Sequence, residues 1–181
     1  GKPVIPQPGT NRWSGVALPW MAFGYGLSVT PLQTLTLYNA VANDGVMVKP
    51  IFVSEIKEWN KTIKKYNTEV INPKICSQET LDKVQAVLEN VVKRGTGSKL
   101  YSKDFSMAGK TGTAQVNYKD KSKLYYASSF VGYFPADEPK YSCIIVVHKP
   151  NVAAGYYGAD VAGPVFKRIA QKIFTDSPST N

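Results

Sequence analysis

Apolar residues recur at helical spacing in three parts of the chain, and the residues around each part mark helix ends. The first helix is predicted to start at Thr30, because threonine is a good N-cap, Pro31 suits the first helical position and Gln33 completes a capping box. Its apolar positions are Leu32, Leu35, Tyr38 and Val41/Ala42. Gly45 is its C-terminal stop.

The second helix is predicted to begin after Ser77 and to end before Gly95, with Glu79 and Asp82 in its first turns, where the helix dipole favours acids. Its apolar face consists of Leu81, Val84, Leu88 and Val91. The third helix covers about 160–174, and Pro164 marks either its start or a kink. Apolar residues line one side of it: Val161, Val165, Ile169 and Ile173.

Residues rich in β-branched and aromatic side chains predict the strands. Residues 46–59 are expected to form one strand that turns at Asn60-Lys61 into a second, giving an exposed ribbon with basic residues on its wet face. Three more strands are expected over 106–117, 125–134 and 141–149, the last two antiparallel because the loop between them is short and turn-rich. The order of elements predicts an α+β domain with a terminal helix lying on an antiparallel sheet.

The two ends of the chain have little periodicity. Residues 1–29 are rich in proline, glycine and aromatics, which predicts an ordered, irregular segment that packs through its aromatic side chains. Residues 177–181 are expected to be a disordered tail. We therefore expect one domain over residues 1–176.

Composition indicates a globular chain and limits the classes of partner that it can bind. The chain has 181 residues, 43% hydrophobic and 19% charged, with no apolar run of membrane-spanning length and no signal-peptide pattern at its start. Its net charge is +9, from lysines that are scattered along the sequence rather than grouped in one block. A nucleic-acid-binding module is the alternative that this charge suggests, with 57–66 as its basic and aromatic stretch. A solvated ribbon face explains that stretch better, and we expect no nucleic acid partner.

Candidate metal ligands are scarce. The chain has two cysteines, Cys76 and Cys143, in no C-x-x-C pattern, and one histidine, His148. A Cys/His metal site is therefore excluded, and no cofactor is expected. The spacing leaves open whether the two cysteines pair. His148 follows an apolar strand, and we interpret it as a structural residue at the strand end.

The stretch "SMAGKTGTAQ" (106–115) is the strongest candidate for chemistry. A phosphate-binding loop requires G-x-x-x-x-G-K-[ST] followed by a helix. Asp104 stands where the first glycine should be, and the residues that follow favour a strand, so both requirements fail. The alternative is K-T-G, which occurs with S-x-x-K and S-D-N in penicillin-recognising serine enzymes. A strand beside a cleft offers backbone groups to an extended peptide, and glycine permits a close approach.

Three residues alone are weak evidence, but four stretches, one of which contains K-T-G, provide context. They are "FGYGLSVTPLQTLTLYNAVANDGVMVKP" (23–50), "AGKTGTAQ" (108–115), "SSFVGYFPADEPKYSCIIVVHKP" (128–150) and "YYGADVAGPVFKRIA" (156–170). In this order and spacing they resemble the C-terminal part of the transpeptidase domain of class B penicillin-binding proteins, above all the cell-division type of peptidoglycan DD-transpeptidase. The resemblance implies the fold shared by penicillin-binding proteins and serine β-lactamases.

The resemblance also implies roles for individual residues. In this family a serine attacks stem peptides ending in D-Ala-D-Ala, forms an acyl-enzyme, and is the target of β-lactam antibiotics. Lys110 would contribute positive charge, and Thr111 and Thr113 would bind the carboxylate of the substrate or antibiotic. The backbone N–H of Thr113 would donate to the oxyanion, and Gly112 would keep the strand surface open.

The nucleophile is not found in this chain. The only S-x-x-K is Ser54 to Lys57, in the predicted ribbon, where the two side chains point to opposite faces. The only S-x-N is Ser179 to Asn181, at the last residue. We therefore expect both motifs, and a membrane anchor, to lie upstream of Gly1, and the chain alone to be inactive.

The resemblance implies a setting for the parent protein as well. It would face the periplasm or another extracytoplasmic space and would contact cell-division proteins. A penicillin-sensing receptor domain and a β-lactamase share K-T-G, but "GYGLSVTPLQ" (24–33) favours the synthase, and β-lactamases lack the aromatic-rich opening.

Overall fold

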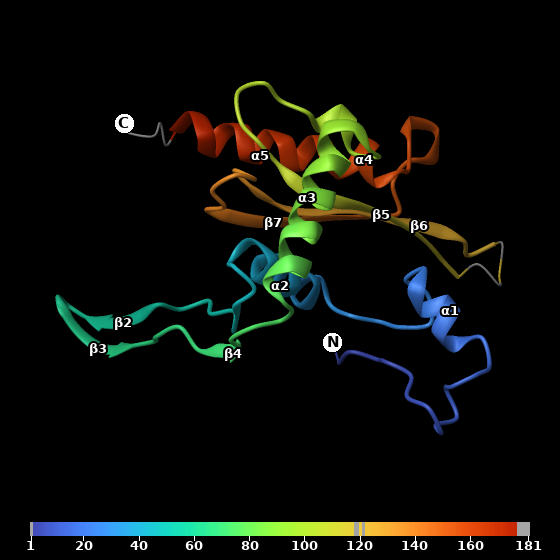
Figure 1. Ribbon diagram of the computed structural model, residues 1–181, viewed down its shortest axis with the longest axis horizontal. Helices are drawn as coiled ribbons and strands as arrows, with labels where there is room; N and C mark the ends of the chain where they lie inside the picture. The colour runs from blue at the N-terminus through green and yellow to red at the C-terminus, as the bar shows by residue number, and fades with distance from the viewer. Residues whose placement is uncertain (1, 118–119, 121, 177–181) are drawn as a thin grey trace. The chain divides into compact units, whose positions relative to one another are not determined.

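The computed structural model describes residues 2–117, 120 and 122–176 and divides the chain into two compact units (Figure 1). The first unit comprises Gly1–Thr34 and the second Leu35–Asn181. The predicted tail, 177–181, lies outside the described residues. In the part of the chain that is described, none of the helices combines the length and apolar character that a membrane crossing requires.

The first unit is irregular, as predicted, but contains one short helix that the sequence did not suggest. An antiparallel bridge joins Val4 to Ser28, and α1 (Ala17–Ala22) lies between them in sequence. Trp20 packs edge-to-face on Tyr25, with ring centroids 5.8 Å apart, whereas Phe23 is 81% exposed. Aromatic packing is therefore confirmed for Trp20 and Tyr25 and wrong for Phe23. Six residues are too few to show a helical period, which is why α1 was missed.

Helix α2 (Pro31–Ala42) begins and ends at the predicted residues. The Thr30 N–H donates to Gln33 Oε1 at 2.9 Å, and the Gln33 N–H donates to Thr30 Oγ1 at 3.2 Å, which completes the capping box. Gly45, at φ 80°, donates its N–H to the carbonyl of Ala40. This left-handed residue ends the helix, as expected from glycine.

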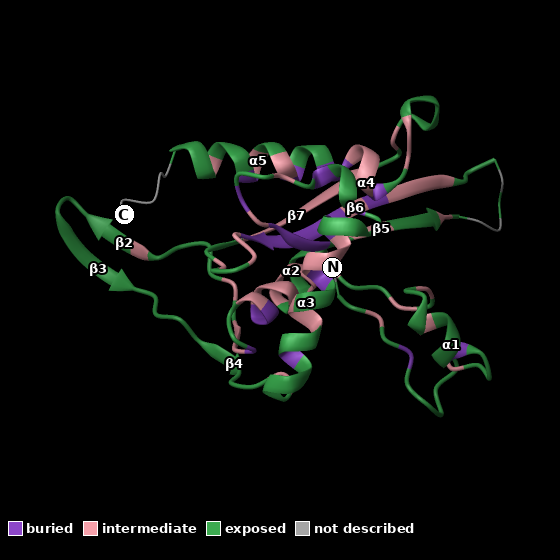
Figure 2. Ribbon diagram, turned by 45° about the horizontal axis from the view of Figure 1, so that its top comes forward, coloured by how far each residue is buried: buried purple, intermediate pink, exposed green. Residues whose placement is uncertain are grey.

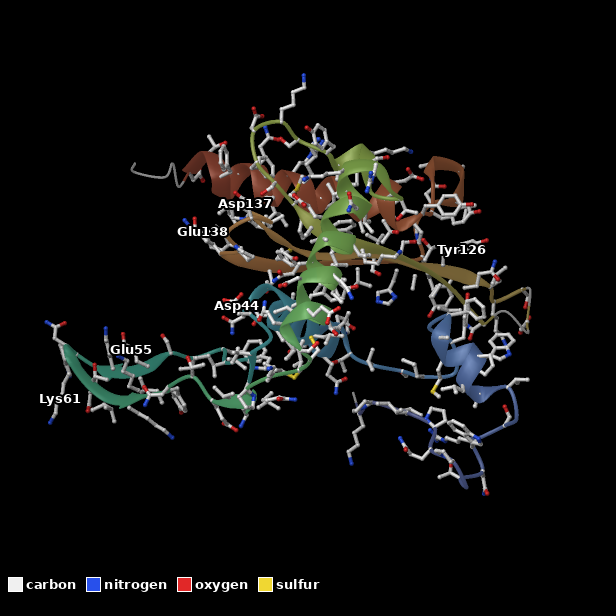
Figure 3. All side chains as sticks on the ribbon, viewed as in Figure 1. Asp44, Glu55, Lys61, Tyr126, Asp137 and Glu138 are labelled. Atoms are coloured by element: carbon white, nitrogen blue, oxygen red, sulfur yellow. The ribbon has the colours of Figure 1, made fainter. Side chains whose placement is uncertain are left out.

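The predicted ribbon forms, but its first strand is not continuous. Strand β1 (Met47–Val48) pairs with β4 (Val70–Asn72), and β2 (Glu55–Glu58) pairs with β3 (Lys61–Lys65). The prediction of one strand over 46–59 is wrong, because Pro50 lies in its middle and has no N–H to donate to a ladder. Figure 3 shows Glu55 and Lys61 on the extended ribbon, and nearly all its side chains are exposed.

Helix α3 (Gln78–Arg94) is capped by Ser77, whose Oγ accepts the Thr80 N–H at 3.2 Å. Its buried residues are Leu81, Leu88 and Val92. The prediction had Val91 on the apolar face, but Val92 is the buried residue, one helical turn beyond Leu88. The helix ends before Gly95, as predicted.

The core of the second unit is a three-stranded antiparallel sheet with the order β5-β6-β7 (Figure 2). The strands are β5 (Ala108–Val116), β6 (Tyr125–Phe134) and β7 (Tyr141–His148), close to the predicted spans. The predicted last helix is divided into α4 (Gly158–Val161) and α5 (Gly163–Asp176). Pro164 is the second residue of α5, so it marks a helix start, where its missing N–H costs no hydrogen bond.

Helix α5 packs on one face of the sheet, which confirms the α+β fold with a C-terminal helix on an antiparallel sheet (Figure 1). Phe166 of α5 lies edge-on to Phe130 and Phe134 of β6, with centroids 4.7 Å and 5.5 Å away. The opposite face carries a second cluster: Val41, Leu81, Leu88, Ala108 and Tyr133. These two clusters cover the two faces of the sheet in which β5, the strand that carries K-T-G, is an edge strand.

Tyr133 is a testable feature of this second cluster. Its hydroxyl is buried and has no hydrogen-bond partner among the described residues, and burial together with the Glu89 charge raises its pKa from 10.0 to about 12. We expect Tyr133→Phe to raise the free energy of unfolding by about 1 kcal/mol near neutral pH, because the unpaired hydroxyl is removed.

The same substitution should change the response to alkali. Because the pKa of Tyr133 is higher in the folded than in the unfolded chain, the folded state holds the hydroxyl proton more tightly. The resulting contribution to the free energy of unfolding is complete below pH 10.0 and is lost as pH rises through about 12. Urea unfolding at neutral and alkaline pH should therefore show a smaller alkaline loss in Tyr133→Phe than in the parent. Tyr141→Phe, at a 44% exposed position, is the control. A less stable Tyr133→Phe at neutral pH would show that the hydroxyl has a partner.

Candidate active site

The K-T-G sequence lies on a strand with an open edge. Strand β5 pairs with β6 and with no other strand in the described part of the chain. Alternate N–H and C=O groups on its other side are therefore not used by the sheet. Thr113, Ala114 and Gln115 are exposed there. Because Lys110 and Thr111 are followed by strand residues and not by a helix, the rejection of a phosphate-binding loop is confirmed.

The register of the sheet assigns the motif side chains to two faces. Thr111 pairs with Phe130 and Thr113 pairs with Ser128, so both threonines share the face that packs on α5. Lys110 pairs with Val131 and belongs to the opposite face. The two hydroxyls that the sequence singled out are thus brought together, and the lysine approaches from the other side of the strand.

The threonines line a hollow of about 310 Å³ beside β5, which we call the hydroxyl pocket. Its lining consists of Thr96, Lys99, Thr111, Thr113, Tyr157, Gly158, Ala159 and Asp160. The Thr96 and Thr111 hydroxyl oxygens are 3.0 Å apart, and the Gly158 N–H donates to Thr113 Oγ1 at 3.0 Å. Because Thr113 accepts this bond, its own hydroxyl proton can be donated to a ligand.

The ammonium of Lys110 lies beside Thr111 even though its Cβ points to the other face. Its Nζ donates to the Thr111 carbonyl at 2.9 Å and lies 3.3 Å from Thr111 Oγ1. The side chain is exposed and therefore free to meet a ligand at the strand edge. This arrangement places one positive charge next to the hydroxyl groups of the motif.

Two glycines allow the close packing around the motif. A Cβ on Gly158 would lie 2.3 Å from the Ser129 carbonyl oxygen and 2.6 Å from that of Gly112, so the start of α4 rests directly on β5 and β6. A Cβ on Gly112 would lie 2.5 Å from Ser129 Oγ. The sequence suggested an open strand surface at Gly112, and the structure adds this contact with the neighbouring strand.

Three tyrosine rings lie against one another at the same end of the sheet. Tyr156 lies between Tyr126 and Tyr157, with ring centroids 4.1 Å and 4.4 Å away (Tyr126 is labelled in Figure 3). The Tyr156 hydroxyl donates to that of Tyr157 at 3.1 Å, which raises the Tyr156 pKa to about 12. Ser128 Oγ donates to the Tyr156 carbonyl and holds this segment on the sheet. Tyr157 and Gly158 both line the pocket.

Sequence reasoning missed Thr96, Lys99 and Asp160, which are polar residues of the pocket lining. Thr96 and Lys99 lie in the glycine-containing stretch directly after α3. The weak signal was two hydroxyl residues and a lysine between Gly95 and Leu100, in "GTGSKL".

The remaining candidates lie away from this pocket lining. Ser54 precedes β2 and Lys57 is within it, so they do not share a helix face. Ser179 to Asn181 fall outside the described residues. His148 is the exposed last residue of β7, as expected of a strand-end histidine. Within the described ranges, no three His, Cys, Asp or Glu side chains are grouped to hold a metal.

The two cysteines are free thiols that pack against different clusters. Cys76 contacts the cluster around Tyr133, and Cys143 contacts the cluster around Phe166. Burial raises the pKa of the Cys143 thiol, as expected of a partly buried residue in an apolar strand.

Comparison with known proteins identifies this arrangement. The sequence profile described as "Penicillin binding protein transpeptidase domain" matches residues 6–171. The chain belongs to this family. It is 33% identical over 168 residues to "Peptidoglycan D,D-transpeptidase FtsI" of Buchnera aphidicola, covering 91% of this chain and 28% of that relative. The chain spans about a quarter of the length of the curated relatives it matches.

Solved structures agree with the assignment to the transpeptidase family. Penicillin binding protein 3 from Mycobacterium tuberculosis superposes with a TM-score of 0.82 at 29% identity, over 98% of this chain and 41% of that one. The complex of the same protein with aztreonam gives a TM-score of 0.81 at 28% identity, with the same coverage. The relatives place the chain in the class B, FtsI- and PBP3-like group, which confirms the resemblance read from the sequence.

Proposed function

We propose that this chain forms one wall of a peptidoglycan DD-transpeptidase active site. In the reaction a serine hydroxyl attacks the D-Ala-D-Ala amide, D-alanine leaves, and an amine of a second stem peptide takes the acyl group from the ester. The observation that carries the proposal is the pair of hydroxyls, Thr111 and Thr113, on one face of an open-edged strand beside a hollow. An extended peptide can lie along such an edge and present its terminal carboxylate to these hydroxyls.

Each motif residue then has a distinct chemical role. Thr111 and Thr113 donate hydrogen bonds to the carboxylate of the peptide or β-lactam. Lys110 supplies positive charge beside them, and its ammonium already lies 2.9 Å from the Thr111 carbonyl. The backbone N–H of Thr113 donates to the oxyanion that forms during attack, and Gly112 lets the substrate approach the strand.

The nucleophile, in this proposal, comes from a segment outside residues 1–181. The only S-x-x-K of the chain, Ser54 to Lys57, is in an exposed two-stranded ribbon, and a serine and lysine that act together need one helix face. Residues 1–176 are thus part of a transpeptidase domain. We call the protein that joins this chain to its S-x-x-K segment the complete transpeptidase.

The setting of the complete transpeptidase is also proposed by relationship. The relatives include proteins named FtsI, and one solved relative holds aztreonam, a β-lactam. We infer that the complete transpeptidase works in the periplasm or its equivalent, anchored to the cytoplasmic membrane by another segment, and that it meets cell-division proteins there. β-Lactams would acylate its serine and remain bound.

Labelling with a fluorescent penicillin tests the proposed function. The complete transpeptidase should form a covalent adduct that survives denaturing electrophoresis, and residues 1–181 alone should form none. Pre-incubation with aztreonam should block the adduct. Absence of labelling in the complete transpeptidase would overturn the function, whereas stable labelling of residues 1–181 at Ser54 would overturn the assignment of the nucleophile to another segment.

A further inference from the structure

An ion pair crosses the rim of the hydroxyl pocket. Lys99 belongs to the short 3-10 helix η1 (Ser98–Leu100), and Asp160 belongs to α4. Lys99 Nζ lies 2.6 Å from Asp160 Oδ1, although the two residues are 61 positions apart in sequence. Both side chains line the pocket together with Thr96, Thr111 and Thr113.

The backbone that carries this pair is held firmly. Leu100 is 1% exposed and packs so closely on Gly163 that a Cβ there would lie 2.7 Å from Leu100 Cδ1. Lys167 of α5 donates to the Tyr101 carbonyl at 2.8 Å, which ties the end of η1 to the same helix. The Lys99 side chain itself is 74% exposed and the Asp160 side chain only 27%. The lysine is therefore the partner that can move toward a ligand.

Lys99 is the only basic side chain in the described lining of the pocket. Lys110 comes from the other face of β5 and approaches at the strand edge, where its Nζ lies 3.3 Å from Thr111 Oγ1. A carboxylate that meets the hydroxyls of Thr111 and Thr113 would bring a negative charge into a hollow whose only other charged lining residue is Asp160. Lys99 is already engaged by Asp160, so the ligand and Asp160 compete for one ammonium.

We propose that Lys99 is a carboxylate-binding residue of the hydroxyl pocket and that Asp160 is its resident competitor. The ligand carboxylate receives hydrogen bonds from Thr111 and Thr113 and takes over part of the Lys99 ammonium from Asp160. The inference rests on the proposed function, since the carboxylate is that of the stem peptide or β-lactam. It adds a specificity-determining pair to that function, which sets how strongly the site prefers anionic ligands.

A purely structural role for the pair makes a different prediction. If the ion pair only clamps η1 to α4, removing either charge should weaken the site in the same direction. If Asp160 competes with the ligand, the two single substitutions should act in opposite directions. We expect Lys99→Gln to lower the second-order rate constant of acylation by benzylpenicillin about threefold to tenfold, and Asp160→Asn to raise it about twofold to fivefold.

The experiment measures this rate constant in the complete transpeptidase at low and high salt. Both effects should shrink at about 0.5 M NaCl, because ions screen exposed charges. Lys99→Arg, which keeps the charge, should stay within about twofold of the parent. The controls are Lys172→Gln and Asp176→Asn, which break an ion pair on α5 (2.7 Å) whose lysine is as exposed as Lys99, and they should change nothing.

The outcomes separate the two proposals. If the complete transpeptidase without substitutions is not acylated, the proposed function fails and this inference fails with it. If it is acylated, two results would overturn only the inference on Lys99 and Asp160. One is that Lys99→Gln behaves like Lys172→Gln, and the other is that Lys99→Gln and Asp160→Asn both slow the reaction. Unfolding midpoints measured beside the rates show whether a slow variant is misfolded. If Lys99→Gln is misfolded, the test rests on Lys99→Arg, whose acylation rate constant should stay within about twofold of that of the unsubstituted protein.

Discussion

Replacing Lys110 with alanine in the complete transpeptidase should lower the rate constant of acylation by benzylpenicillin about 100-fold to 1,000-fold, the effect expected from removing one electrostatic contributor to an acyl-transfer site. The Lys110 ammonium lies 2.9 Å from the Thr111 carbonyl and 3.3 Å from Thr111 Oγ1, at the edge where negative charge would develop. Stopped-flow or gel-based acylation with a fluorescent penicillin measures the loss. Stability should hardly change, because the side chain is exposed.

Lys103→Ala is the matched control for Lys110→Ala. Lys103 is also an exposed lysine near β5, but it lines a different hollow, together with Phe105 and Phe174. Its loss removes the same charge and should leave acylation within about twofold. A Lys110→Ala protein that keeps its unfolding midpoint and loses less than about tenfold in rate would remove Lys110 from the active site.

Replacing Gly158 with alanine should lower the free energy of unfolding by about 3 kcal/mol and impair the pocket as well. The new methyl group would lie 2.3 Å from the Ser129 carbonyl oxygen and 2.6 Å from the Gly112 carbonyl oxygen. Both contacts are with backbone, which cannot rotate away as a side chain does, so α4 must separate from β5. This separation lengthens the 3.0 Å hydrogen bond from the Gly158 N–H to Thr113 Oγ1.

Urea unfolding and acylation of the same Gly158→Ala preparation measure the two effects together. Gly15→Ala is the control, since no atom lies within 4 Å of the position of its added methyl group. This control should stay within about 0.5 kcal/mol of the parent. If Gly158→Ala were equally stable and equally reactive, the close packing of α4 on the K-T-G strand would be contradicted.

The ends of helices were predictable because the signals are local. Thr30 with Gln33, Ser77 and Gly45 act within a few residues of themselves, through a side chain or a left-handed φ. The same holds for Pro164, whose ring excludes it from a helix interior. Such residues determine where a helix begins or ends whatever the helix later packs against.

The errors in the fold have physical reasons of a different kind. The strand over 46–59 is interrupted near Pro50 because continuity depends on which N–H groups the partner strand uses. Val92 is buried in place of Val91 because α3 contributes to both clusters, and its inward face depends on where it crosses β5. The face that α3 buries is therefore not encoded within a short window of sequence, whereas Pro50 is a local signal against a continuous strand.

The sequence by itself determined the chemical elements of the candidate site. It identified Lys110, Thr111, Gly112 and Thr113 on a strand, and strand alternation alone places the two threonines on one face. Four segments in the right order then indicated the family. These conclusions require only residue identity, spacing and the period of a strand.

Only the tertiary structure decided what surrounds those hydroxyls. Thr96 and Lys99 come from the turn after α3, and Gly158 and Asp160 come from α4, so the pocket joins segments that are far apart in sequence. Their meeting depends on how α3, α5 and the sheet pack, through Leu100 on Gly163 and Phe166 on Phe130. Long-range packing of this kind leaves no periodic trace, and for this reason the Lys99–Asp160 pair appears only in the folded chain.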